Sequence, residues 1–158
     1  KRKIEYMSLK QEIHQKKFRS QRLKGIVNLV FTYNWLKSHL QAHLKKFDIT
    51  MQQFNVLRIL NGQFPNPATI ALIKERMLDR MSDASRIVNR LERKGLVKRE
   101  PSTVDRRIIN VFITEKGRAR ILETDKYSNE IDKLFAALSQ EELKQLNYLL
   151  DKIRDVKL

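Results

Sequence analysis

The fold is decided by residues 82–95, which read SDASRIVNRLERKG. The apolar residues of this stretch recur at the three- and four-residue spacing of a helix, so they can pack inward together: Ala84, Ile87, Val88 and Leu91. The opposite side carries small polar and cationic side chains, and Gly95 ends the pattern. The stretch therefore predicts a short amphipathic helix with one polar, basic side.

The segments on either side of this helix extend the motif. A short helix is predicted over 69–78, a turn over 79–81, and Ser82 as the N-cap of the next helix. A strand is predicted over 96–99, a basic turn over 105–107 and a returning strand over 108–113. Two short helices joined by a tight turn and followed by a basic hairpin are the parts of a winged helix-turn-helix lobe, which we place at 48–113.

The remaining chain is predicted to be helical, since it holds only four Gly and three Pro. We expect one helix from Leu9 to about Phe47, one after a Thr50–Gln53 capping box, and one from Glu115 toward Leu138. A last helix follows a capping box at 139–142. The fold class is mainly α with a small β wing (α+β). We expect a single domain over 1–158, in which 8–47 and 114–158 form a helical dimerisation region, because they carry more apolar positions than a small lobe can cover.

The charge of the chain indicates an anionic partner. Lys and Arg total 33 against 18 Asp and Glu, which gives a formal net charge of +15. Double-stranded DNA is the leading partner, and an anionic membrane surface is the other candidate. No apolar run approaches the roughly 18 residues that span a bilayer, and the start has no signal-peptide core, so a cytoplasmic protein is expected. With no Cys, disulfides, thiolate metal sites and thiol redox sensing are excluded.

The polar side of the central helix suits the reading of DNA. A helix fits the major groove, where Arg and Asn can grip guanine and adenine edges, and a thin basic hairpin can reach the minor groove. The alternative is an ordinary solvated face. A solvated face does not explain why a short helix precedes this one, why a glycine ends it and why a basic hairpin follows. Lys98 and Arg99 lie on or beside this hairpin. The predicted DNA contacts are Ser82, Asp83, Ser85, Arg86, Asn89, Arg90, Arg106 and Arg107.

Asp105 is unexpected on a surface meant for phosphate, and two roles stay open for it. It can hold a nearby Arg in position through a charge-assisted pair. It can equally be a turn residue that bonds its own backbone.

These residues resemble the MarR family of bacterial transcription regulators. The resemblance follows element order over roughly residues 20 to 155, and it is sharpest over 82–117. The segments that carry it are 54–60, 85–99, Asp105-Arg106-Arg107 and Ile113-Thr114-Glu115-Lys116-Gly117.

The resemblance implies a two-fold homodimer with interleaved terminal helices. It also implies that Asp105 braces the recognition helix and that Arg107 enters the minor groove. Many members of the family are repressors released by small phenolic or anionic ligands, bound between the dimer helices and the DNA lobe. A two-fold dimer predicts a pseudo-palindromic operator with half-sites about one turn, 34–36 Å, apart.

Aromatic and His residues of the first helix are candidates for other sites. Phe31, Trp35 and His39 could line an effector pocket, although ordinary packing is the simpler interpretation of each. His39 and His43 lie four residues apart, as helical metal ligands can, but no third ligand is evident, so no metal is expected. We find no catalytic constellation and expect neither a cofactor nor an enzyme.

The sequence thus predicts a dimeric, sequence-specific DNA-binding regulator, with a ligand-responsive repressor preferred. The alternatives are a non-specific architectural DNA-binding protein, a module that binds an acidic protein, and an activator of the same fold.

Overall fold

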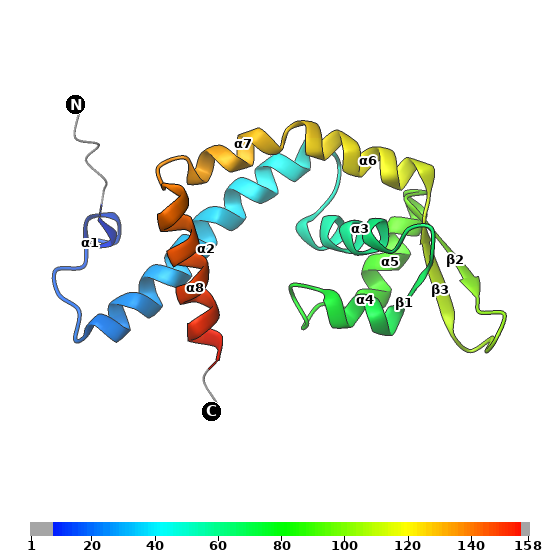
Figure 1. The fold of residues 1–158 in the computed structure, drawn as a ribbon, viewed down its shortest axis with the longest axis horizontal. Helices are drawn as coiled ribbons and strands as arrows, with labels where there is room; N and C mark the ends of the chain where they lie inside the picture. The colour runs from blue at the N-terminus through cyan, green and yellow to red at the C-terminus, as the bar shows by residue number, and fades with distance from the viewer. Residues whose placement is uncertain (1–7, 156–158) are drawn as a thin grey trace. The chain divides into compact units, whose positions relative to one another are not determined.

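The computed structural model describes residues 8–155 and contains helices with a small sheet (Figure 1). The prediction of a mainly helical chain with a β wing is confirmed. The elements in chain order are α1 Leu9–Glu12, α2 Gln21–Lys45, α3 Met51–Gln63, β1 Ala68–Thr69, α4 Ile70–Arg76, α5 Ala84–Arg93, β2 Val97–Pro101, β3 Ile109–Ile113, α6 Glu115–Lys126, α7 Ser128–Asp132, the 3-10 helix η1 Lys133–Phe135 and α8 Gln140–Arg154. The ends of the predicted single domain, residues 1–7 and 156–158, lie outside the described part.

The described part of the chain forms two compact units, which divide between residues 42 and 43. The first unit contains α1 and most of α2. The prediction of one helix from Leu9 to Phe47 is wrong, because α1 ends after one turn and α2 begins at Gln21. His14, with a φ of 54°, lies in the break. The segment 14–20 is polar except for Phe18, so it has little apolar surface with which packing could stabilise a helix.

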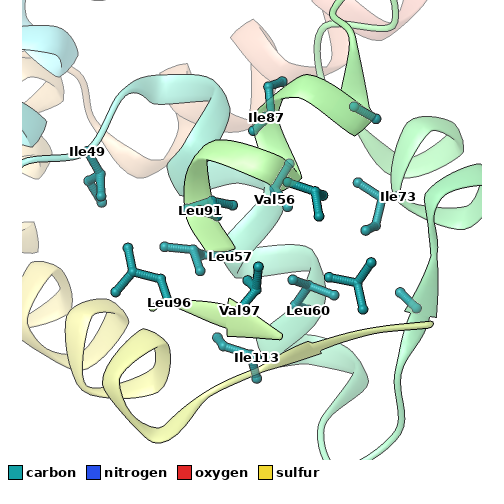
Figure 2. Packing of buried hydrophobic residues seen from close by; sticks show 14 of the residues in the cluster. Ile49, Val56, Leu57, Leu60, Ile73, Ile87, Leu91, Leu96, Val97 and Ile113 are labelled. Carbon is teal, nitrogen blue, oxygen red and sulfur yellow. The ribbon is translucent and has the colours of Figure 1, made fainter. Parts of the chain in front are cut away.

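The core of the second unit lies where α3, α4 and α5 pack against the sheet (Figure 2). Val56, Leu57 and Leu60 form the inner face of α3, and Ile73 covers it from α4. The buried residues of α5 are Ala84, Ile87, Val88 and Leu91, as the sequence predicts. Leu96, Val97, Val111 and Ile113 close the core from the sheet side. The polar side of α5 is therefore left at the surface of this core.

The sheet has the strand order β1-β3-β2, and both pairs are antiparallel. Val97 faces Ile113 and Arg99 faces Val111 in the β2–β3 ladder, which forms the wing. Sequence reasoning missed β1, which pairs only Ala68 and Thr69 with β3 and is too short for a periodic pattern.

Side-chain caps set most of the helix starts. The capping boxes Thr50–Gln53 and Ser139–Glu142 are both present, as the sequence predicts. Ser82, however, is not the cap of α5. Asp83 is, since its carboxylate accepts the backbone N–H of Arg86 at 3.0 Å.

The predicted helix from Glu115 toward Leu138 is interrupted at Tyr127, which separates α6 from α7. None of the residues of α8 is buried. Apolar side chains are also exposed along α2: Ile26, Leu29, Val30, Tyr33 and Trp35. None of the helices within residues 8–155 is long and apolar enough to cross a membrane.

Candidate nucleic-acid interface

Helix α5 presents two unlike faces because its apolar residues are buried in the core, as Figure 2 shows for Ile87 and Leu91. Ser85, Arg86, Arg90 and Arg93 are exposed, and Asn89 is half-buried beside them. Within residues 8–155, neither Arg86 nor Arg90 forms a salt bridge or a side-chain hydrogen bond. Two cations without a salt-bridge partner among these residues are thus available to an external anion.

The side chains of the residues just before α5 form local hydrogen bonds. The hydroxyl of Ser82 donates to the Asp79 carboxylate at 2.6 Å. Asp83 caps the helix, so its carboxylate is turned toward backbone amides. The two residues hold the start of α5 in place, and Asp83 offers no positive charge to a phosphate.

A groove of about 270 Å³ runs between the starts of α3 and α5. Thr50, the N-cap of α3, lines it together with Gln52 and Gln53 of the first turn. The other lining residues belong to α5 or the residues before it: Ser82, Asp83, Arg86, Ile87 and Arg90. Both unpaired arginines of α5 therefore border a recess rather than a flat surface.

The tip of the wing is organised by Asp105. Its carboxylate accepts the backbone N–H of Arg107 at 3.0 Å and the Arg107 Nε and Nη2 at 3.2 Å each. These side-chain and backbone hydrogen bonds lower the pKa of the Asp105 carboxyl. The structure thus joins the two roles that the sequence left open, the charge-assisted pair and the backbone bond. Among residues 8–155, Asp105 makes no hydrogen bond or ion pair with α5, so the brace of the recognition helix implied by the resemblance is not seen there.

The wing cations have different environments. The guanidinium of Arg107 is almost fully exposed despite its pairing, and Arg106 is exposed beside it. Lys98 pairs with Glu100 at 2.8 Å and lies over the ring of Phe112. Arg106 and Arg107 are therefore the cations that the hairpin presents outward at its tip.

Arg99 lies in β2 of the hairpin, as the sequence predicts, but sequence reasoning missed the contacts of its side chain. It was grouped with the cations of the hairpin, but its guanidinium turns to α5, where it bonds the Glu92 carboxylate and the Asn89 side-chain oxygen. A signal existed in the sequence: Asn89 and Glu92 are three apart and share a helix face, and Glu92 is the single acidic residue within α5. The missing information was which face of α5 the strand passes.

In the first unit, a pocket of about 210 Å³ is lined by Phe31 and Trp35 together with Leu9, Glu12, Asn28 and Thr32. His39 does not line it. Its ring lies 4.7 Å from the Trp35 ring, and its Nδ1 is 2.9 Å from the Trp35 carbonyl oxygen.

His43 is buried at the end of α2, and its Nδ1 is 3.4 Å from a carboxylate oxygen of Glu130. His39 and His43 thus have separate neighbours. No group of three or more His or acidic residues in the described part of the chain could hold a metal ion.

Comparison with known proteins places this geometry in a family. A model described as the MarR family matches residues 47–108. The HTH-type transcriptional regulator MgrA of Staphylococcus aureus is 38% identical over 111 residues, which are 69% of this chain and 72% of that protein.

Solved structures agree with this assignment. A MarR-like transcription regulator from Bacillus cereus superposes with a TM-score of 0.73 at 26% identity, covering 85% of this chain and 94% of that one. MepR of S. aureus, solved in complex with DNA, has a TM-score of 0.70 at 25% identity, covering 87% and 97%. These matches are to regulators, which confirms the prediction that the chain is not an enzyme. The chain belongs to the MarR family and is a winged helix-turn-helix transcriptional regulator.

Proposed function

We propose that the chain binds a specific double-stranded operator with α5 in the major groove and the β2–β3 wing in the adjacent minor groove. The observation that carries this proposal is the exposed, unneutralised pair Arg86 and Arg90 on a helix whose other face is fixed in the core. Two guanidinium groups without a salt bridge gain most binding free energy from a partner that is anionic or rich in hydrogen-bond acceptors. The likeness to MepR, which was solved with DNA, supports the same arrangement.

The predicted contact residues divide by what each side chain can offer. Arg86 and Asn89 are assigned to base edges, where their donors match purine acceptors. Arg90, Ser85 and Ser82 are assigned to phosphate or base edges. Asp83 acts indirectly, by capping α5.

Arg106 and Arg107 are assigned to the minor groove. A guanidinium is favoured in this groove because a narrow groove concentrates negative potential. Neither contact requires a particular base, so these residues contribute affinity more than sequence preference.

We also propose a homodimer formed by the helical regions 8–47 and 114–158. The support is the row of exposed apolar residues on α2 and the absence of any buried residue in α8. A solvent-exposed apolar row of this length favours association with a second copy. Two-fold symmetry then duplicates α5 and calls for half-sites about 34–36 Å apart.

Repression by occlusion of the promoter, with release by a small ligand, is the proposed mode of action. The pocket beside Phe31 and Trp35 has room for a single aromatic ring, since a cavity of about 150 Å³ already accepts benzene. A ligand that alters the spacing of the two recognition helices would misplace them in their grooves and lower affinity.

The test of DNA binding is selection from random duplexes, followed by titration of the enriched site at several salt concentrations. We expect Arg86→Ala and Asn89→Ala to weaken binding and relax base preference, and Arg107→Ala to weaken binding to all sequences alike. Gly62→Ala, at an exposed position on α3 outside the groove and the proposed dimer region, is the control and should change nothing. If both α5 variants bind the selected site as the parent does, α5 is not the reading element. Equal binding of all duplexes at physiological salt would instead indicate the architectural alternative.

The effector proposal has its own readout. Trp35 is the single Trp of the chain, so its fluorescence reports the pocket directly. A phenolic or anionic aromatic ligand that occupies the pocket should change this fluorescence and lower operator affinity at the same concentrations. A ligand that releases the operator without altering Trp35 emission binds elsewhere.

A further inference from the structure

We infer that Arg99 is a positioning residue that turns the Asn89 amide so that Asn89 meets DNA as a hydrogen-bond donor and reads keto bases, guanine or thymine. The inference rests on the proposed binding of α5 in the major groove. It adds a residue of the wing to the determinants of base preference.

The geometry around Arg99 links three side chains from two elements. The Arg99 Nε lies 2.8 Å and its Nη2 lies 2.6 Å from the same Glu92 oxygen, Oε2. Its third nitrogen, Nη1, donates to Asn89 Oδ1 at 2.5 Å. Glu92 therefore holds one edge of the guanidinium, and the remaining nitrogen faces Asn89. The side chains of Arg99 and Glu92 are only 39% and 35% exposed, so the ion pair is partly shielded from water.

The chemistry of the guanidinium decides which end of the amide faces it. Arg has five N–H donors and no acceptor, so the Asn89 atom beside Nη1 must be the oxygen. The Asn89 NH₂ group then points away from Arg99. Asn89 is half-buried on the polar face of α5, so this NH₂ group is the end that remains for a base.

This orientation limits what Asn89 can read. Recognition of adenine by Asn needs both ends of the amide, since the oxygen accepts from the adenine N6 amine while the nitrogen donates to N7. With its oxygen turned toward Arg99, Asn89 presents its NH₂ donors to the base. Guanine offers two neighbouring acceptors, N7 and O6, and thymine offers O4. Adenine offers N7 alone, beside its N6 amine, which is a donor and opposes a second donor, and cytosine offers only its N4 amine. Keto bases are therefore favoured at the position that Asn89 faces.

The test compares base preference at that position among variants. In a library with the operator randomised, Asn89→Ala identifies the position as the one whose preference is lost. The parent should favour guanine or thymine there. Arg99→Ala frees the amide to rotate, so the preference should move toward adenine by about fivefold or more, with other positions unchanged. Lys98→Ala is the matched control, because Lys98 lies on the same strand but pairs with Glu100.

A second variant guards against a folding defect in Arg99→Ala. Glu92→Gln keeps the size of the side chain but removes the charge that holds the guanidinium, and it should shift the preference in the same direction. A merely structural role of Arg99 predicts equal weakening for every sequence and no shift at the Asn89 position, which would overturn the inference. An unchanged keto preference in both variants would also overturn it, while the proposed operator binding would stand. If the parent protein itself binds all duplexes equally, the proposed function is refuted.

Discussion

Replacing Gly117 by Ala should destabilise the protein, although the same change in an ordinary helix stabilises it. Gly117 is buried in the first turn of α6, where its N–H donates to the hydroxyl of the N-cap Thr114 at 3.1 Å. A Cβ at this position would lie 2.1 Å from the backbone oxygen of Leu96 and 2.8 Å from the Ile113 Cγ1. Both distances are well inside van der Waals contact, and the closer atom belongs to the backbone, which cannot rotate away.

The size of the expected destabilisation follows from how far α6 must move. Helix α6 has to withdraw from Leu96 by about 1 Å to reach normal contact. Overpacking of this kind costs about 1–3 kcal/mol. The withdrawal also stretches the hydrogen bond from the Thr114 N–H to the Leu96 oxygen, now 3.1 Å, which is worth about 1 kcal/mol. The gain in helix propensity from Gly to Ala offsets up to about 1 kcal/mol. The net loss expected in the free energy of unfolding is about 1–3 kcal/mol.

Urea denaturation followed by circular dichroism, at one fixed protein concentration, measures this loss. Gly62→Ala is the matched control. Gly62 lies in the last turn of α3, it is exposed, and nothing lies within 4 Å of its Cβ position. We expect it to be neutral or to stabilise by up to about 1 kcal/mol. If the two variants shift stability in the same direction and by similar amounts, the close approach of α6 to Leu96 is not as the structure has it.

Three further outcomes are expected. Asp83→Ala should lower the free energy of unfolding by about 1 kcal/mol in a urea titration, because it removes the cap of α5, while Asp83→Ser should keep most of it. The Lys46 ammonium, 2.9 Å from Glu130, lowers the pKa of that carboxyl through a hydrogen bond and its charge. A lowered pKa contributes stability above the ordinary pKa of a Glu that is lost as the pH falls through the lowered value, so Lys46→Gln should raise the Glu130 pKa in an NMR titration. An unmoved titration curve would show that the pair does not form in solution. Asn55→Ala should speed hydrogen exchange of the Leu78 amide, which donates to Asn55 Oδ1 at 2.9 Å, whereas Asn55→Asp should protect it.

The sequence predicted the parts of the fold that rest on local chemistry. The inward face of α5 follows from apolar spacing alone, and the Thr50–Gln53 and Ser139–Glu142 boxes follow from side chains that satisfy amides of their own helix. The wing was predicted because its turn and strands are continuous in the chain. The errors in α1–α2 and α6–α7 arose where polar stretches supply no periodic pattern, so that a helix and a break read alike.

The candidate site was predicted less completely, because its decisive contacts join residues distant in the chain. Arg99 meets Asn89 only because β2 returns along α5. The groove exists because Thr50 and Gln52, at the start of α3, line the same recess as Arg86 and Arg90 of α5. The role of Gly117 was equally hidden, since a glycine in a helix pattern does not reveal which backbone passes beside it.

The bonds that join Asp105 to Arg107 have a consequence for how the wing meets a duplex. A free arginine samples many rotamers, and inserting it into a groove removes that freedom at the moment of contact. Here much of the freedom is already removed on folding, since one carboxylate grips both the backbone and the guanidinium. The Arg107 side chain is thus preorganised before the wing meets DNA. If the wing enters the minor groove as proposed, a stiff arginine fits a narrow groove better than a wide one, so the wing would respond to groove width and not to the identity of a base.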